Sequence, residues 1–290
     1  MAEVGVFEEQ RPRLFGVAYR MLGSAVEAED VVQDAFLRWH KADRVEVPAA
    51  WLTKVVTNLC LNRLASARVT RERYVGAWLP EPVLTAGGVL GPLETVEQRD
   101  LVSLGFLVVL ERLSPPERAV FVLREAFGHP HREIAEILDV DEAHSRQLHS
   151  RARKHIAETR RRFAADQGQH RRIVDRFLAA TLDGDMAGLE RLLADDVVSW
   201  ADGGGTTTAA RRPIVGKTKV LRYLLGFHAR PEATLVAAEV AEVNGQPAAL
   251  VRFGDGLAAV FAPEIQDGLV VALRLVVSPA KLAYADTQAK

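Results

Sequence analysis

The chain has 290 residues, of which 48% are hydrophobic and 26% charged, a composition that fits two or three packed domains and excludes large-scale disorder. Its formal net charge is -1, so any contact with nucleic acid must use local basic patches. The single cysteine, Cys60, excludes an internal disulfide and is expected to be a buried thiol in a reducing compartment. No signal core opens the chain and no apolar run reaches the roughly 20 residues that span a bilayer, so we expect a cytoplasmic protein without membrane contact.

The first 74 residues show the three-to-four spacing of apolar residues that predicts amphipathic helices. The spacing recurs in "RLFGVAYRML" and "AEDVVQDAFLRWHKA", and "PAAWLTKVVTNLCLNRLASAR" begins a long helix with Pro48. The next stretch, "VGAWLPEPVLTAGGVLGPLE", concentrates three prolines and four glycines, which break helix and strand alike. We therefore expect a helical domain over residues 1–74 and a linker over residues 75–93.

A second helical block is expected over residues 94–165, where "LSPPER" supplies an N-cap at Ser114 and prolines suited to a first helical turn. It closes with "HREIAEILDVDEAHSRQLHSRARKHI", two amphipathic helices joined by "DVD" in a helix-turn-helix pattern. Two positions fit this pattern poorly, because Asp139 stands where such turns favour glycine and Ser145 where the second helix usually buries an apolar residue.

The second helix of this hairpin exposes side chains that can hydrogen-bond base edges or neutralise phosphates: Arg146, Gln147, Ser150, Arg153 and Lys154. Helical hairpins with a polar face also occur in domains that bind nothing. Residues 142–165, however, hold seven Lys or Arg against two acids, and this local excess favours DNA.

Residues 166–290 are expected to form an α+β domain. An amphipathic helix ("HRRIVDRFLAATLDGD") and a shorter one ("MAGLERLLAD") precede apolar segments separated by Asn244-Gly245, Asp255-Gly256 and Asp267-Gly268. Because these dipeptides favour tight hairpin turns, we predict strands at "ATLVAAEVAEV", "PAALVRF", "LAAVFAPEIQ" and "LVVALRLVV". The prediction is an antiparallel sheet with helices packed on one face.

Three stretches in series resemble sigma factors of the extracytoplasmic-function (ECF) class, the promoter-recognition subunits of RNA polymerase. "DVVQDAFLRWH" resembles the region 2 helix that docks on the beta-prime clamp, and "AWLTKVVTNLCLNRL" resembles the segment that opens and reads the upstream edge of the promoter bubble. "LSPPERAVFVLREAFGHPHREIAEIL" resembles region 4, which reads the minus 35 element. The resemblance implies two all-α sigma domains over residues 1–165. Its implied partners are promoter DNA and core RNA polymerase, the latter through the beta-prime clamp and the beta flap.

The residue types suit these roles. Polar groups stand beside large apolar side chains at the candidate polymerase-binding positions Asp30, Gln33, Asp34, Phe36 and Trp39. Phe36, Trp39 and the neighbouring Leu37 fit ordinary core positions equally well. A stacking surface is combined with amide and cationic donors at the candidate DNA-binding positions Trp51, Asn58, Asn62, Arg63 and Arg68. Trp51 could equally be buried, and "NRLASAR" is less basic than the family pattern.

The rest of the chain resembles SnoaL-like domains, which have a cone-shaped α+β fold, and the combination resembles a subgroup of these sigma factors with a fused C-terminal extension. The local matches are "WLPEP", "DGGGT" and "SPAKL", where the family forms are closer to DGGGK and NPDKL. We expect an interdomain regulatory contact built from Trp78, Leu79, Pro80, Asp202, Gly203, Gly204, Lys281 and Leu282. The extra domain would then act as a built-in regulator, in place of a separate inhibitor protein, by biasing the spacing of the two DNA-reading domains.

Two other classes of function stay open on the sequence. A helix-turn-helix transcriptional regulator with a ligand-binding SnoaL-like domain would bind DNA without core polymerase. An enzyme would use Asp202 as a general base, as relatives on this fold use an Asp or His, but an Asp beside three glycines is more often a turn former. We therefore expect no catalytic residue, no cofactor and no metal site. The cone leaves room for a small ligand that the sequence does not name.

Overall fold

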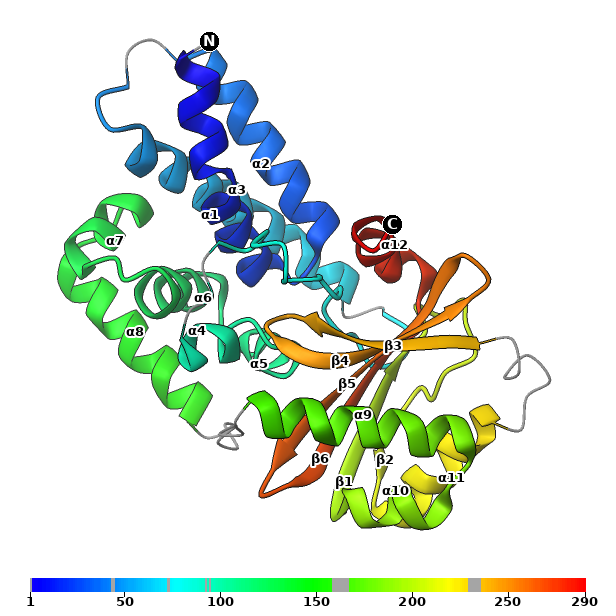
Figure 1. Cartoon of the computed structure of the whole chain (residues 1–290). Helices are drawn as coiled ribbons and strands as arrows, with labels where there is room; N and C mark the ends of the chain where they lie inside the picture. Colours follow the sequence, from blue (N-terminus) through cyan, green and yellow to red (C-terminus); the bar gives the residue numbers. More distant parts are fainter. Residues whose placement is uncertain are drawn as a thin grey trace. The chain divides into compact units, whose positions relative to one another are not determined.

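The computed structural model describes residues 2–42, 45–71, 74–91, 93, 95–157, 167–228 and 236–290. The chain divides into two compact units, whose elements are labelled in Figure 1. Unit 1 comprises Met1–Arg73, Gly87–Val102 and Phe106–Arg160, and unit 2 comprises Tyr74–Ala86, Ser103–Gly105 and Arg161–Lys290. Among the helices of the described residues, none is long and apolar enough to cross a bilayer.

The regular elements between residues 2 and 157 are helical, as predicted. In chain order they are α1 (Ala2–Leu22), α2 (Ala25–His40), α3 (Pro48–Arg71), α4 (Val96–Asp100), α5 (Leu104–Leu110), α6 (Pro115–Phe121), the π-helical turn η1 (Val122–Ala126), α7 (His131–Leu138) and α8 (Glu142–Ala157). Ser114 and Glu117 form a capping box at the start of α6, with Pro115 in the first turn, which confirms the expected start of that helix. Cys60 is fully buried, and burial raises the pKa of its thiol, so it is the expected core cysteine.

Helices from both predicted sigma regions belong to unit 1. Arg118, which is 3% exposed, donates hydrogen bonds to the Met21 carbonyl at 2.7 Å and to the Glu111 carboxylate at 2.8 Å. Lys54 of α3 donates to the Glu136 carbonyl of α7 at 2.6 Å. Tyr74 and residues 75–86, which are the first part of the predicted linker, pack with the C-terminal residues in unit 2. The predicted domain boundaries at residues 74, 93 and 165 stay a prediction.

Unit 2 is an α+β fold, as expected, and Figure 1 shows α9, α10 and α11 on one face of its sheet. Its elements are α9 (Gln167–Asp183), α10 (Met186–Leu192), β1 (Leu193–Asp202), β2 (Ile214–Val215), α11 (Lys217–His228), β3 (Val236–Val243), β4 (Gln246–Phe253), β5 (Gly256–Gln266), β6 (Leu269–Val276) and α12 (Pro279–Gln288). The strand order is β2-β1-β6-β5-β4-β3. A core of apolar side chains from α9, α10, α11 and the sheet packs together in this unit, with Phe177, Leu224 and Leu273 almost fully buried.

The structure corrects the predicted sheet in three places. β1 pairs in parallel with β6, so the sheet is mixed rather than antiparallel. The helix expected over "MAGLERLLAD" ends at Leu192, and the residues after it already belong to β1. Between β4 and β5 the positive backbone φ lies at Gly254 rather than at Gly256, so this turn is shifted from the predicted dipeptide. The two other dipeptide turns have positive φ at both residues, as a type I′ turn requires.

Candidate nucleic-acid interface and linker anchor

The helix-turn-helix forms at α7 and α8, and its two poorly fitting residues have specific local solutions. Asp139 adopts the left-handed conformation, with φ of 55°, that glycine usually provides at a helix C-terminus. Ser145 is fully buried, but its hydroxyl lies 3.0 Å from Nδ1 of His131, so its polar atom has a partner. Asp141 accepts a hydrogen bond from the His144 amide at 2.7 Å, which is the predicted cap. The hairpin therefore forms without the usual glycine and apolar residues.

The outward face of α8 carries the candidate base- and phosphate-contacting residues. Ile134, Leu148 and Ala152 are buried between the two helices, which fixes the register of the exposed face. All five candidate residues of α8 are exposed: Arg146, Gln147, Ser150, Arg153 and Lys154. Arg146 also pairs with Glu142 one turn earlier. This surface can reach a DNA groove, and its contacts with DNA stay a prediction.

The candidate polymerase-binding face on α2 mixes exposed and half-buried side chains. Asp30 and Gln33 are exposed, whereas Asp34, Phe36 and Trp39 are half-buried. Phe36 packs against Phe7 of α1, with ring centroids 4.9 Å apart, so part of its surface serves the helical core. The neighbouring Leu37 is 51% exposed, which makes it the more accessible apolar side chain on this helix.

The candidate DNA-binding residues of α3 are not equally free to contact DNA. Trp51 and Asn58 are half-buried and Asn62 is exposed, and Trp51 lies 5.9 Å from Trp39 between ring centroids. Arg63 forms ion pairs with Asp34 at 3.2 Å and Asp30 at 3.6 Å, so it joins the two candidate surfaces. Arg68 belongs to α3, but its side chain lies outside the described part of the chain.

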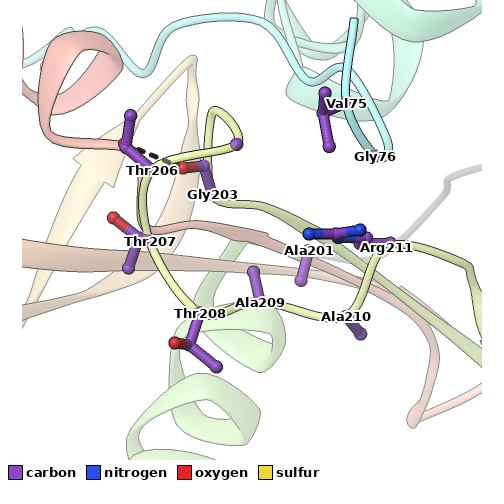
Figure 2. A pocket seen from close by; sticks show the side chains of 11 residues that line it. Val75, Gly76, Ala201, Gly203, Thr206, Thr207, Thr208, Ala209, Ala210 and Arg211 are labelled. Carbon is purple, nitrogen blue, oxygen red and sulfur yellow. Dashed lines mark hydrogen bonds between the residues drawn. The ribbon is translucent and has the colours of Figure 1, made fainter.

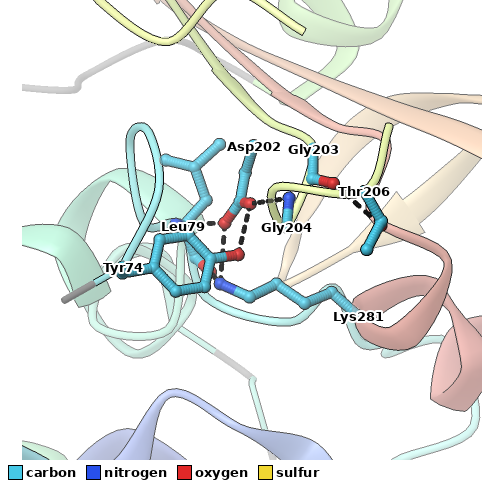
Figure 3. Close-up of polar contacts among 7 residues, drawn as sticks. All are labelled: Tyr74, Leu79, Asp202, Gly203, Gly204, Thr206 and Lys281. Carbon is cyan, nitrogen blue, oxygen red and sulfur yellow. Dashed lines mark hydrogen bonds and ion pairs between the residues drawn. The ribbon is translucent and has the colours of Figure 1, made fainter. Parts of the chain in front are cut away.

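In unit 2 the three family-like motifs meet around the buried carboxylate of Asp202 at the end of β1 (Figure 3). Its Oδ1 accepts hydrogen bonds from the Tyr74 hydroxyl at 2.5 Å and the Gly204 amide at 3.0 Å. Its Oδ2 accepts from the Leu79 amide at 2.8 Å and from Nζ of Lys281 at 2.7 Å. The side chain of Asp202 is 0% exposed and that of Lys281 is 10% exposed, so this is a buried ion pair.

Lys281 also fixes the aromatic side chains of the linker. Its Nζ donates to the Leu79 carbonyl and lies 4.3 Å from the centre of the Trp78 ring and 4.8 Å from that of Tyr74. Such cation–π contacts are strongest where the ammonium is withdrawn from water. Gly204 approaches the third motif closely, because a Cβ built there would lie 2.5 Å from Oγ of Ser278. We call residues 74–85 the linker strap and the Asp202–Lys281 pair its anchor.

The distal part of the linker strap is held by further hydrogen bonds that the sequence did not single out. Asn244, which is 1% exposed in the β3–β4 turn, accepts from the Val83 amide at 3.0 Å through its side chain. Its own amide donates to the Val83 carbonyl at 2.9 Å. The side chain of Gln288 on α12 brackets Leu84, accepting from its amide at 2.8 Å and donating to its carbonyl at 3.1 Å.

The hydrogen bonding of Asp202 bears on the enzyme hypothesis. A carboxylate has about four lone-pair sites, and the four donors named above, two on each oxygen, occupy all of them. A general base needs a free lone pair directed at its substrate. Asp202 is therefore engaged as a structural anchor. Within the described residues, no group of three or more His, Cys, Asp or Glu side chains could hold a metal ion.

Sequence comparison identifies both sigma regions. The family models described as Sigma-70 region 2 and Sigma-70, region 4 match residues 6–70 and 104–156. The "ECF RNA polymerase sigma factor SigJ" of Mycobacterium tuberculosis (strain ATCC 25618 / H37Rv) is 40% identical over 292 residues, covering 96% of this chain and 93% of the relative. The "Probable ECF RNA polymerase sigma factor SigI" of Mycobacterium tuberculosis (strain CDC 1551 / Oshkosh) is 34% identical, covering 94% of this chain and 92% of the relative.

A solved structure shows the same similarity over the whole length. The crystal structure of the Mycobacterium tuberculosis ECF sigma factor SigJ matches with a TM-score of 0.77 and 36% identity, covering 97% of this chain and 98% of the other. Similarity across both sigma regions and the C-terminal unit favours a sigma factor over a free-standing regulator, and sigma factors are not enzymes. The chain belongs to the ECF family of RNA polymerase sigma factors, which bind core RNA polymerase and direct promoter recognition.

Proposed function

We propose that unit 2 regulates promoter recognition by this sigma factor, because it holds the chain that connects region 2 to region 4. The observation that carries the proposal is the buried anchor, in which Asp202 and Lys281 together bind both the amide and the carbonyl of Leu79. A Pro- and Gly-rich connection without such contacts would behave as a variable tether. The anchor turns part of that tether into a segment of fixed length.

The size of the effect follows from chain geometry. The minus 10 and minus 35 elements lie about 25 base pairs apart, or about 85 Å at 3.4 Å per base pair. A free segment of residues 72–95, which ends where α4 begins, would have a root-mean-square span of about 27 Å and an extended reach of about 80 Å. Holding residues 74–85 removes about 40 Å from the adjustable part of that reach. The linker strap therefore restricts the separations at which both regions can bind DNA together.

Within this proposal, the two sigma regions contact polymerase and DNA through the surfaces described above. The α2 face binds the beta-prime clamp and region 4 binds the beta flap, while α3 reads the minus 10 element and α8 the minus 35 element. Exposure supports the assignment for Gln33 on α2 and for the outward face of α8. Gln33→Lys should weaken binding to core polymerase in a pull-down at fixed salt, whereas Gln10→Lys on α1 should not.

The test of the regulatory role is the dependence of transcription on promoter spacing. Initiation would be measured with core polymerase on templates whose spacer is lengthened or shortened by one and two base pairs. The native chain should initiate over a narrow range of spacers. A variant with a released linker strap, Lys281→Met combined with Asn244→Gly, should initiate over a wider range because its tether is longer and more variable.

A matched control is Lys217→Met, which removes a cation from unit 2 at an ion pair with the exposed Asp195 and leaves the linker strap intact. Circular dichroism would establish that both variants keep the fold. An unchanged spacer profile in the released variant would contradict the regulatory role. The assay compares initiation rates between templates with different spacers. A variant that loses activity equally on all templates would therefore not give the wider spacer range that is expected.

A further inference from the structure

A pocket of about 240 Å³ lies beside the anchor, within unit 2 (Figure 2). The loop after β1 supplies most of its wall and the start of the linker strap supplies the rest. Its lining residues are Val75, Gly76, Ala201, Gly203, Gly205, Thr206, Thr207, Thr208, Ala209, Ala210 and Arg211. This volume equals about eight water molecules at about 30 Å³ each. It lies below the roughly 300–1,000 Å³ of typical drug-sized ligand sites, so the pocket suits a small molecule.

The electrostatics of the pocket are positive. No acidic side chain lines it, and Arg211 is its one charged lining residue. The adjacent carboxylate of Asp202 is buried and already paired with Lys281. Residues 203–228 contain five Lys or Arg and no Asp or Glu, and Glu81 of the linker strap, which acts electrostatically on Tyr74, does not line the pocket. An anion therefore meets a favourable field at this site.

The pocket also supplies a charged hydrogen-bond donor, the guanidinium of Arg211. Within the described residues, the Arg211 guanidinium forms no hydrogen bond or ion pair, and in Figure 2 it is turned toward Ala201 inside the ring of lining residues. The hydroxyls of Thr207 and Thr208 likewise have no partner among the described residues. A guanidinium matches the geometry of phosphate or carboxylate oxygens, whereas the hydroxyls of Thr207 and Thr208 point away from the Arg211 side chain in Figure 2.

The linker strap forms one side of this pocket. Val75 and Gly76 line it, one and two residues after Tyr74, whose hydroxyl donates to Asp202. Gly205, with φ of 74°, allows the loop to approach the strap, because a Cβ built there would lie 3.3 Å from Cβ of Val75. A molecule in the pocket would thus contact the loop after β1 and the start of the strap at the same time.

We propose that this pocket binds a small oxyanion, a metabolite carrying a phosphate or carboxylate group, with Arg211 as its principal ligand. Bound there, the oxyanion bridges Arg211 and the backbone near Val75, and it holds the linker strap against unit 2. The consequence for transcription rests on the regulatory role proposed above. Binding itself does not, since it depends only on the pocket.

Binding would be measured by calorimetric titration of the full chain with inorganic phosphate and with glycerol 3-phosphate, at constant ionic strength kept with chloride. Arg211→Gln should weaken the apparent affinity by about tenfold or more, because it removes the charged donor. Arg212→Gln is the matched control, since Arg212 is the next residue, is equally exposed and does not line the pocket. It should change the affinity less than about twofold. Equal unfolding midpoints would show that both variants are folded.

Three outcomes overturn the proposal: no saturable binding of either probe, equal weakening in both variants, or binding of duplex DNA through Arg211 while neither small oxyanion binds. Hydrogen exchange supplies the second readout. Saturating glycerol 3-phosphate should slow exchange of the amides of residues 75–79 in the native chain and not in Arg211→Gln. If oxyanions bind through Arg211 but the released-strap variant keeps its spacer profile, the regulatory role fails and the binding site stands.

Discussion

Removing either partner of the buried anchor should destabilise unit 2, and removing both should cost less than the sum of the two single changes. The side chain of Asp202 is 0% exposed and that of Lys281 is 10% exposed. Asp202→Asn keeps the shape of the side chain but leaves the ammonium of Lys281 without its counter-charge, which for a buried pair costs about 3–5 kcal/mol. Lys281→Met leaves the carboxylate with three neutral donors, so its expected cost is at the lower end of that range.

The double variant, Asp202→Asn with Lys281→Met, should cost less than the sum of the single changes, with a coupling energy of about 1–3 kcal/mol. Urea unfolding combined with hydrogen exchange of β1 and α12 amides reports on unit 2 by itself. Asp195→Asn provides the control, because Asp195 is 97% exposed where it pairs with Lys217, and no measurable change is expected. A coupling energy below about 0.5 kcal/mol would show that the anchor is not an energetic unit and would refute this reasoning.

Three smaller perturbations test other parts of the structure. Asn244→Gly keeps the left-handed turn but loses the side-chain acceptor for Val83, so unit 2 should lose about 1–3 kcal/mol of unfolding free energy in urea titrations; an unchanged midpoint would contradict the role of this side chain. Asp139→Gly should stabilise unit 1 by about 0.5–1 kcal/mol in thermal unfolding, since φ is 55° there, and a lower melting temperature would count against it. Burial lowers the pKa of His170 in the folded chain. In the unfolded chain this histidine binds a proton near its ordinary pKa of about 6.5, whereas in the folded chain it is still neutral at that pH. The unfolding free energy should therefore fall as the pH drops below about 6.5, and His170→Gln should flatten that slope between pH 7.5 and 5.5.

Local patterns were sufficient to predict the helices and most of the turns. The three-to-four spacing of apolar residues located α1, α2, α3, α7 and α8, and the helix-capping pattern at Ser114 located the start of α6. Asn244-Gly245 predicted a hairpin because both residues tolerate positive φ. In each case the signal and the structure it specifies lie within a few residues of one another.

Pairings between distant parts of the chain could not be predicted in the same way. β1 does not alternate regularly between buried and exposed residues, and its parallel partner β6 begins 76 residues after it begins, at Leu269. The composition of the linker strap predicted only that it would form neither helix nor strand. Its partners Asn244 and Gln288 lie 161 and 204 residues away from the positions they bind. The dipeptide Asn244-Gly245 indicated a turn, and no motif indicated that either side chain contacts the strap. Resemblance to a family pointed to Asp202 and Lys281, but nothing in the sequence indicated Tyr74.

The chemistry of Asp202 is decided by these distant partners rather than by its neighbours in sequence. An aspartate after a strand and before three glycines suits a general base as well as a turn, and sequence alone leaves both roles open. In the folded chain, one donor comes from the adjacent loop at Gly204, while the other three come from Tyr74, Leu79 and Lys281. With both oxygens filled, the carboxylate holds the linker and has no lone pair for a substrate proton. The neighbouring pocket shares the same loop but keeps its cation, Arg211, without an acidic side chain in its lining, which is why we assign ligand binding to that pocket and anchoring to Asp202.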